Sequence, residues 1–397
     1  IIEKHHMAEQ GHFPLVAIDP VANAQNEWVA LSVTLAPGAD LAQRLQAVFA
    51  GADLLTAIAP LDCLLHLDGP EALTVPVLAL LPANRVGLVI KAEVLASGSA
   101  ARQLAELHAY GYRVWLDGDI PEGAKAPPAL RSAARDCRAH GDTALPPGRL
   151  IALFGPHLAH GVDGARRFSE CENAGFDWFS GDYPCDPDAA PSKDDDGSSR
   201  RRILTLLGLL ARDAESRELE DQIKQDPALA YHLLKLVNSA AFTVNTQITS
   251  FSHAITVLGR RQLQRWLQLL LYARQQPDGL PNLLLPLAAR RAAQLEALSR
   301  EAGGDRDAQD LAFMTGVFSL LDRLLHMPMA AIAAELYLPD DVAGALVDRR
   351  GRLGAWLRLT ETHPDGSLLE EAGVSPAAWW HSQLHAWHWA IQVGRNV

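Results

Sequence analysis

The stretch Asp226-Pro-Ala-Leu-Ala-Tyr-His-Leu-Leu-Lys-Leu-Val-Asn-Ser-Ala-Ala-Phe242 predicts an amphipathic helix with a defined start. Its first residue can cap the helix, and Pro227 suits the first helical position, where a missing N–H costs nothing. Leu229, Leu233 and Val237 then fall on one face, at the three- and four-residue spacing of a buried stripe. The stretch therefore indicates a helix with one buried face.

A second helix is predicted within Ser250-Phe-Ser-His-Ala-Ile-Thr-Val-Leu-Gly-Arg-Arg-Gln-Leu-Gln-Arg-Trp-Leu267. Ser252 can cap it, and Gly259 is expected to interrupt the apolar pattern. The pattern then continues through Leu263, Trp266 and Leu267.

These segments, taken in order, resemble the HDOD domain, an all-helical bacterial signalling module similar to the HD phosphohydrolases. The resemblance runs from about Arg202 to Leu369 and covers roughly half of the chain. It rests on Asp226–Phe242, on Ile248–Trp266 and on Gly316-Val-Phe-Ser-Leu-Leu-Asp-Arg-Leu-Leu325.

Length and composition indicate a globular, multi-domain chain. It has 397 residues, of which 48% are hydrophobic and 21% charged, enough for two domains with separate cores. No apolar run approaches the ~20 residues that span a bilayer, and no signal peptide is visible. We therefore expect a cytoplasmic protein without membrane contact. Ile1–His6 contains a His pair before Met7, so a tag remnant and native sequence both remain open.

Four cysteines stand far apart in the sequence and form no C-x-x-C pair, which argues against a zinc knuckle or a thioredoxin-type site. Such scattered thiols suit a reducing cytoplasm. They are Cys63, Cys137, Cys171 and Cys185.

The net charge of −12 lies in the first half of the chain. Residues 1–199 hold 14 Lys and Arg against 26 Asp and Glu, an excess that would repel a polyanion. The two helices around Gly259 superficially resemble a helix-turn-helix, but they are apolar where they would face DNA. We expect no nucleic acid partner. We expect the arginine clusters to be solvated helix faces; these are Arg260–Arg261 with Arg265, Arg290–Arg291, and Arg349–Arg350 with Arg352.

A Pro-, Asp- and Ser-rich stretch at residues 186–199 has no apolar face and predicts a flexible linker. It divides the chain into residues 7–185 and residues 200–397. In the first part, short apolar runs alternate with helical patterns, which favours a mainly parallel (β/α) barrel. Expected strands are Phe13–Ile18, Trp28–Leu35, Cys63–Leu67, Val75–Leu81, Arg85–Ile90, Tyr112–Leu116, Leu150–Phe154 and Phe176–Phe179, and expected helices are Leu41–Phe49, Ala100–Tyr110 and Gly164–Ala174.

Residues 7–185 resemble a degenerate EAL domain, a barrel that in active relatives hydrolyses cyclic di-GMP. Gly111–Asp117 resembles the strand that carries metal-binding aspartates, and Glu172–Tyr183 resembles the final helix, strand and loop. A barrel, a linker and an HDOD module in this order is the layout of EAL–HDOD two-domain signalling proteins.

The resemblance implies a carboxylate site for two divalent metals and a lysine, and this sequence departs from it. The strands at Trp28–Thr34 and Arg85–Ile90 contain no acid, and the lysine-bearing strand has no clear counterpart around Leu130–Arg135. Leu153–His157 replaces a strand that should supply a glutamate. Only Asp117 matches, with Gly118 beside it and Asp119 one place further on; we expect Asp117 to cap a loop.

The helical module also departs from the HD pattern. The positions of the adjacent His-Asp pair hold Ser319 and Leu320, and the upstream histidine region, Leu287–Gln294, holds arginines and no histidine. Leucine cannot ligate a metal and serine is a poor substitute for imidazole. We expect no metal here, with Asp322 pairing with Arg323 or another arginine.

The segment Trp379–Trp389 places His381, His385 and His388 on one helix face, a spacing that two-histidine zinc sites share. Ser382 stands where an H-E-x-x-H motif needs glutamate. We therefore favour a helix that packs its tryptophans and leucine onto the other domain or a partner; these are Trp380, Leu384 and Trp387.

The sequence thus predicts a degenerate EAL-like barrel joined to an HDOD helical bundle, without enzyme activity, cofactor or metal. Its expected function is signal transduction by docking a protein partner, with no binding of cyclic di-GMP. Two alternatives remain: a sensor that binds cyclic di-GMP without cutting it, and a residual metal-dependent phosphodiesterase or phosphohydrolase. The candidate interaction surface comprises Asn238, Ser239, Arg260, Arg261 and Ser319.

Overall fold

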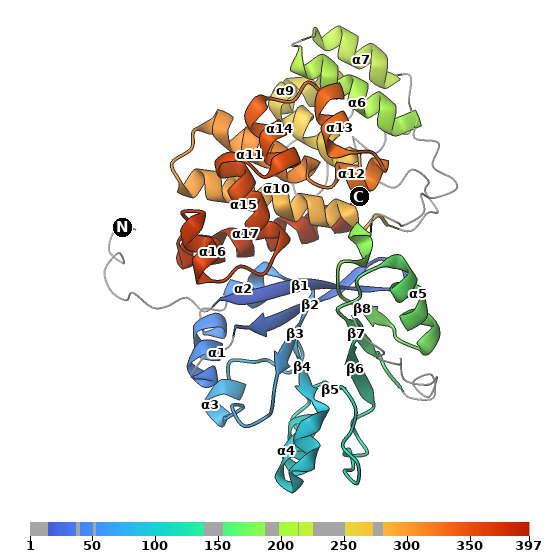
Figure 1. Ribbon diagram of the computed structural model, residues 1–397, viewed down its shortest axis with the longest axis vertical. Coiled ribbons are helices and arrows are strands. Elements are labelled where there is room, and N and C mark those ends of the chain that lie inside the picture. Colours follow the sequence, from blue (N-terminus) through green and yellow to red (C-terminus); the bar gives the residue numbers. More distant parts are fainter. Residues whose placement is uncertain are drawn as a thin grey trace.

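The computed structural model describes residues 15–36, 40–50, 53–138, 154–186, 198–212, 214–224, 251–272 and 281–396. The first part is a closed eight-stranded barrel and the rest is helical, which confirms the predicted fold class (Figure 1). The segment 226–242 and most of the predicted linker lie outside the described residues.

The strands close the barrel in sequence order, β1 to β8. β1 runs antiparallel to both of its neighbours, whereas β2 to β8 are parallel. The strands are β1 (Val16–Asn23), β2 (Trp28–Leu35), β3 (Asp62–Leu67), β4 (Val86–Lys91), β5 (Val114–Asp117), β6 (Ser132–Asp136), β7 (Leu158–His160) and β8 (Trp178–Phe179).

Short helices cover the outside of the barrel (Figure 1). Asp40 caps the first of them, accepting a hydrogen bond from the Gln43 N–H at 3.0 Å. The elements are α1 (Leu41–Phe49), α2 (Asp53–Ala57), α3 (Val75–Leu78), η1 (Ala92–Ala96), α4 (Gly98–Ala109), α5 (Ala165–Ala174) and η3 (Tyr183–Cys185).

One strand prediction in the barrel was wrong, and one strand was missed. The segment Val75–Leu81 starts a helix, because Pro76 in the first turn removes a donor that a strand would need. β6 was missed, since its sequence Ser-Ala-Ala-Arg-Asp has no apolar alternation. Most of the strand expected at Leu150–Phe154 lies outside the described residues; Phe154 is exposed, and β7 begins at Leu158.

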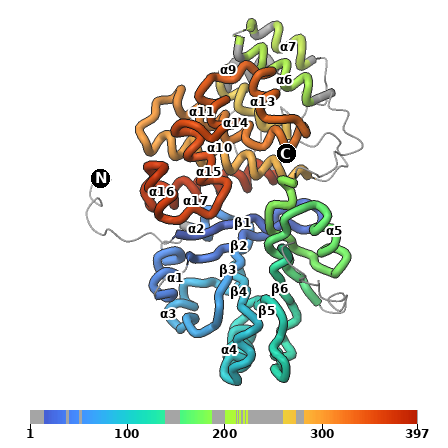
Figure 2. Tube along the Cα trace, in the orientation of Figure 1, coloured from blue at the N-terminus to red at the C-terminus, as the bar shows by residue number. Residues whose placement is uncertain are grey.

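The helical region lies above the barrel in the view of Figure 2. Its buried apolar side chains form one large core. Leu263, Trp266 and Leu267 are buried in it, as predicted. Its helices are α6 (Ser198–Ala211), α7 (Ser216–Lys224), α9 (Phe251–Leu270), α10 (Leu284–Glu301), α11 (Arg306–Phe318), α12 (Leu321–Leu325), α13 (Met329–Glu335), α14 (Asp340–Asp348), α15 (Gly351–Glu361), α16 (Gly366–Glu371) and α17 (Pro376–Asn396).

Gly259 interrupts α9 as predicted, with a non-helical φ of 74°. A side chain is disfavoured at such a φ, so glycine suits the kink. The predicted cap, Ser252, was wrong, because the helix already begins at Phe251.

The last helix, α17, contributes to both apolar cores, which confirms that its tryptophans pack onto the other domain. One face joins the helical core through Trp379, Ala390 and Val393. A neighbouring face enters the core of the barrel, and these residues are Trp380, Leu384, Trp387 and Ile391. Figure 1 shows α17 lying against the barrel beside β1 and α2.

Polar contacts add to this interface. The Asn26 side chain donates to the carbonyl of Pro281 at 3.1 Å. His363 Nε2 lies 2.9 Å from Asp19 Oδ1, and donates to it because a carboxylate only accepts. The barrel and the helical region are therefore joined by apolar packing and by hydrogen bonds.

Candidate functional site

The carboxyl ends of the parallel strands meet at one mouth of the barrel, the place where barrels of this kind carry their sites. Below the mouth, the barrel interior is filled by a buried layer that includes Ala30, Leu64, Trp115 and Leu158. Side chains of a strand alternate between its faces, so residues two positions further on point into the barrel again. These next positions are polar: Ser32, His66, Lys91, Asp117 and His160.

Four of these side chains form a connected polar row across the mouth. The Ser32 hydroxyl lies 2.7 Å from His66 Nε2. The His66 ring meets the His160 ring edge to face, with centroids 5.4 Å apart. His160 Nε2 donates to Asp117 Oδ1 at 3.0 Å. The row thus links β2, β3, β7 and β5.

Burial controls the charges in this row. Burial, and then the nearby His160, lower the pKa of His66 to about 4, so its ring is neutral near pH 7. Burial alone would raise the pKa of Asp117. The His160 hydrogen bond and the charges of His160, His66 and Lys91 outweigh this and lower it, which keeps Asp117 ionised.

The prediction that Asp117 caps a loop was wrong, because its carboxylate is held by His160 inside the barrel mouth. Asp119 is largely exposed and pairs with Arg135 instead. Sequence reasoning missed Ser32, His66 and His160. The available signal was a polar residue two positions after a buried one, near the end of each apolar strand.

The carboxylates around the mouth have basic partners from the same chain. Besides Asp117, the pairs are Asp19 with His363, Asp68 with Lys91 at 3.9 Å, Asp119 with Arg135, and Asp136 with Arg138 at 3.4 Å. Inward positions on the strands supply a hydroxyl, two imidazoles, an ammonium and the carboxylates of Asp19, Asp117 and Asp136, each of which has a basic partner. A pair of divalent cations that prefers several oxygen ligands would have to displace these partners.

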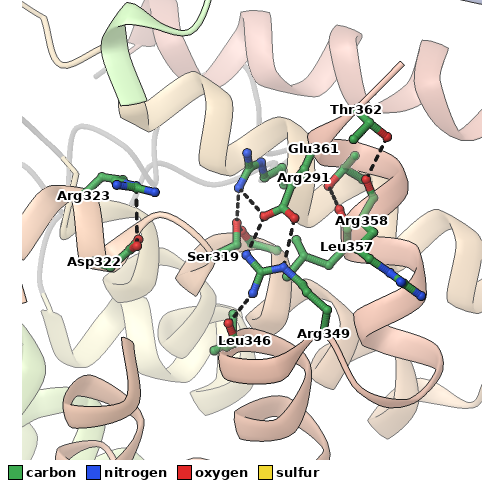
Figure 3. Close-up of polar contacts among 12 residues, drawn as sticks. Arg291, Ser319, Asp322, Arg323, Leu346, Arg349, Leu357, Arg358, Glu361 and Thr362 are labelled. Atoms are coloured by element: carbon green, nitrogen blue, oxygen red, sulfur yellow. Dashed lines mark hydrogen bonds and ion pairs between the residues drawn. The ribbon is translucent and has the colours of Figure 1, made fainter. Parts of the chain in front are cut away.

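The helical region has its own polar cluster, built on α10, α11, α14 and α15 (Figure 3). Arg291 Nη1 contacts the Ser319 hydroxyl at 3.1 Å and Glu361 Oε1 at 3.4 Å. Arg349 donates two hydrogen bonds to the same carboxylate, from Nη2 at 2.7 Å and from Nε at 2.9 Å. Paired bonds of this kind hold a carboxylate firmly in one orientation.

The positions that correspond to the metal-binding pair of HD proteins lie beside this cluster. Ser319 is buried and its hydroxyl donates to the Gly316 carbonyl at 2.8 Å. Leu320 is buried among apolar side chains. Asp322 pairs with Arg323 at 3.5 Å, which confirms that prediction. The guanidinium of Arg291 therefore supplies the positive charge next to Ser319.

The predicted interaction surface is only partly described. Asn238 and Ser239 lie outside the described residues. Arg260 is half-buried. Arg261 is partly exposed and is engaged by Asp310 and by Asp307 at 3.5 Å. Ser319 is buried, so its side chain faces Arg291 rather than solvent.

The expectation that the arginine clusters are solvated was wrong for two of them. Arg290 is half-buried, lies 5.2 Å from the centroid of the Trp387 ring, and donates to the Thr360 carbonyl at 2.8 Å. Arg291 and Arg349 are engaged by Glu361. Counting charges along the sequence does not identify such partly buried arginines. Their long side chains can bury the aliphatic part while the guanidinium keeps its polar partners.

Among the described residues, no group of three or more His, Cys, Asp or Glu side chains is arranged to hold a metal ion. In the same ranges, no helix is both long enough and apolar enough to cross a bilayer. His388 of α17, one of the three histidines with zinc-site spacing, has its Nδ1 3.1 Å from the carbonyl of Ala57.

Residues 200–320 match the HDOD domain family. Over 207 residues the chain is 30% identical to the cyclic di-GMP phosphodiesterase CdgJ of Vibrio cholerae, covering 51% of this chain and 47% of that protein. It spans about half the length of the curated relatives it matches.

Solved structures similar to each part are also known. The EAL domain of Mycobacterium smegmatis DcpA matches with a TM-score of 0.34 and 16% identity, covering 42% of this chain and 90% of that one. An HDOD domain protein from Geobacter sulfurreducens matches with a TM-score of 0.31 and 15% identity, covering 50% and 84%. Likenesses this distant support no conclusion about activity. The family match and the CdgJ relative nevertheless relate this chain to cyclic di-GMP signalling modules.

Proposed function

We propose that this protein is a signal transduction protein without catalytic activity, which acts by binding a protein partner. The observation that carries the proposal is the pairing of carboxylates at the barrel mouth with basic side chains of the same chain. A phosphodiesterase that uses two divalent cations needs several free carboxylates to hold them and to lower the pKa of the attacking water. Here Ser32 and Lys91 stand on β2 and β4, the strands where such ligands would be needed.

The helical region supports the same proposal. A hydrolytic HD site requires imidazole and carboxylate ligands converging on metal, whereas Arg291 and Ser319 here contact each other at 3.1 Å. A fixed guanidinium would repel a metal ion at that place. Docking of a partner requires neither metal nor reaction.

Turnover of cyclic di-GMP tests this proposal directly. The full chain is incubated with the dinucleotide and Mg²⁺ or Mn²⁺, and linear products are separated by chromatography. We expect no product above the buffer control. Hydrolysis that disappears in an Asp117→Asn variant would overturn the proposal, since it would assign catalysis to this mouth.

A sensor that binds cyclic di-GMP without cutting it is the second candidate. It is favoured by the half-exposed ammonium of Lys91 beside two imidazoles in the mouth, which could face a phosphate group. Calorimetry with the dinucleotide separates the two candidates. Micromolar or tighter binding that weakens in Lys91→Gln would favour the sensor, and no heat of binding would favour the protein-docking role.

A further inference from the structure

The polar row in the barrel mouth continues into the helical region through Asp19. On β1, Asp19 lies directly opposite Ser32 of β2, so the two side chains stand on the same face of the sheet as close neighbours. Its carboxylate accepts the hydrogen bond from His363, which lies between α15 and α16. A row of neighbouring polar side chains therefore leads from the helical region into the mouth.

A half-buried cation of the helical region is also influenced by Asp19. This cation is Arg290, and burial, followed by the charge of Arg291, lowers its pKa to about 10. The negative charge of Asp19 opposes this effect. Arg290 also covers the ring of Trp387, a residue of the barrel core. One barrel carboxylate thus stabilises two basic side chains of the helical region.

We infer that Asp19 couples the barrel mouth to the helical region, so that a change of charge in the mouth alters how firmly His363 and the segment 361–366 are held. This inference deepens the proposed function, because a signalling chain without a reaction needs a physical route between its two parts. The route runs from Asp117 through His160, His66 and Ser32 to Asp19, and then to His363.

Electrostatics fixes the direction of the effect. Asp19 faces His66 on the mouth side and His363 and Arg290 on the helical side. Asp117, His160 and Lys91 surround His66, and Asp182 lies near His363. Added positive charge in the mouth competes with His363 for the carboxylate of Asp19. Added negative charge there favours the protonated ring of His363 and tightens the contact.

The test follows the titration of the His363 ring by NMR in the full chain, together with hydrogen exchange of residues 361–372. The Asp19 hydrogen bond raises the pKa of His363 in the wild type. We expect His66→Lys to lower this pKa and speed exchange. His66→Gln should leave both unchanged, because His66 is already neutral near pH 7. Lys91→Glu should raise the pKa.

Lys91 is half exposed, so Lys91→Glu tests the coupling even if His66→Lys does not fold. Arg102→Glu makes the same charge change on the outer surface of α4 and serves as its control. A His363 pKa that is unmoved by Lys91→Glu, or moved equally by Arg102→Glu, would overturn the inference. None of these measurements uses turnover or a partner, so their failure leaves the proposed function standing.

Discussion

Removing Trp387 should destabilise the barrel even though this residue belongs to the last helix of the helical region. Its side chain is 1% exposed and lies in the barrel core. Its ring centroid is 5.5 Å from that of Trp28, and the guanidinium of Arg290 lies 5.2 Å from it. Trp387→Ala therefore removes a side chain that both parts contact.

The expected loss is about 3–5 kcal/mol in the free energy of unfolding, the usual cost of deleting a buried tryptophan. The cation–π contact with Arg290 accounts for about 1 kcal/mol of that amount, because Trp387 is buried and Arg290 is half-buried. The indole N–H of Trp387 is buried and has no hydrogen-bond partner among the described residues. Trp387→Phe should therefore cost well under the alanine value, since it removes an unsatisfied donor and keeps most of the apolar contact.

Chemical denaturation and hydrogen exchange provide the assay, and Trp389→Ala provides the matched control. Trp389 lies on the same helix, is half-buried and packs against Phe313 at 5.7 Å between ring centroids, within the helical region. We expect Trp387→Ala to speed exchange in β1, β2 and α2, and Trp389→Ala to leave these elements unchanged. Equal effects of the two variants on exchange in the barrel, or no effect of Trp387→Ala there, would refute the inference that α17 completes the barrel core through Trp387.

Three further predictions concern single sites. The pKa of His66 is about 4 in the folded chain and higher in the unfolded chain, so the unfolded chain takes up the proton first as the pH falls. The free energy of unfolding should therefore fall by roughly 3 kcal/mol between pH 6.5 and 4. In His66→Gln, the denaturation midpoint should depend less on pH in this window. Glu361→Gln weakens the paired bonds from Arg349 and should cost about 1–2 kcal/mol by urea denaturation, and no loss would contradict the role of the cluster. Gly316→Ala would press a Cβ against the backbone of α10 and should cost about 1–3 kcal/mol. Gly208→Ala, which meets no atom within 4 Å, should not destabilise the protein.

The sequence was sufficient for the fold class and for most elements with clear periodicity. The kink at Gly259 and the burial of Trp266 and Leu267 follow from helix rules that act locally. The strand prediction for Val75–Leu81 was wrong because apolar content alone does not separate a short strand from a helical turn. β6 was not predicted because its pairing with β5 and β7, rather than an apolar alternation of its own, makes it a strand.

The candidate site was harder to predict because it depends on which strand ends meet in space. Asp117 stood out in the sequence, whereas its partner His160 lies on another strand, 43 positions away. The bond between His363 and Asp19 joins residues 344 positions apart, and no spacing rule covers such a pair. The arginine clusters likewise became distinguishable only when Glu361 and Trp387 were placed beside them.

The shared helix α17 has a consequence for biosynthesis. A ribosome makes the chain from its N-terminus, so β1 to β8 emerge well before Trp380, Leu384, Trp387 and Ile391. The nascent barrel must therefore wait through about 200 further residues, from Phe179 to Trp380, before its core can be completed. During that interval the apolar surface destined for α17 is exposed, and a chaperone or a transient substitute contact would find its target there.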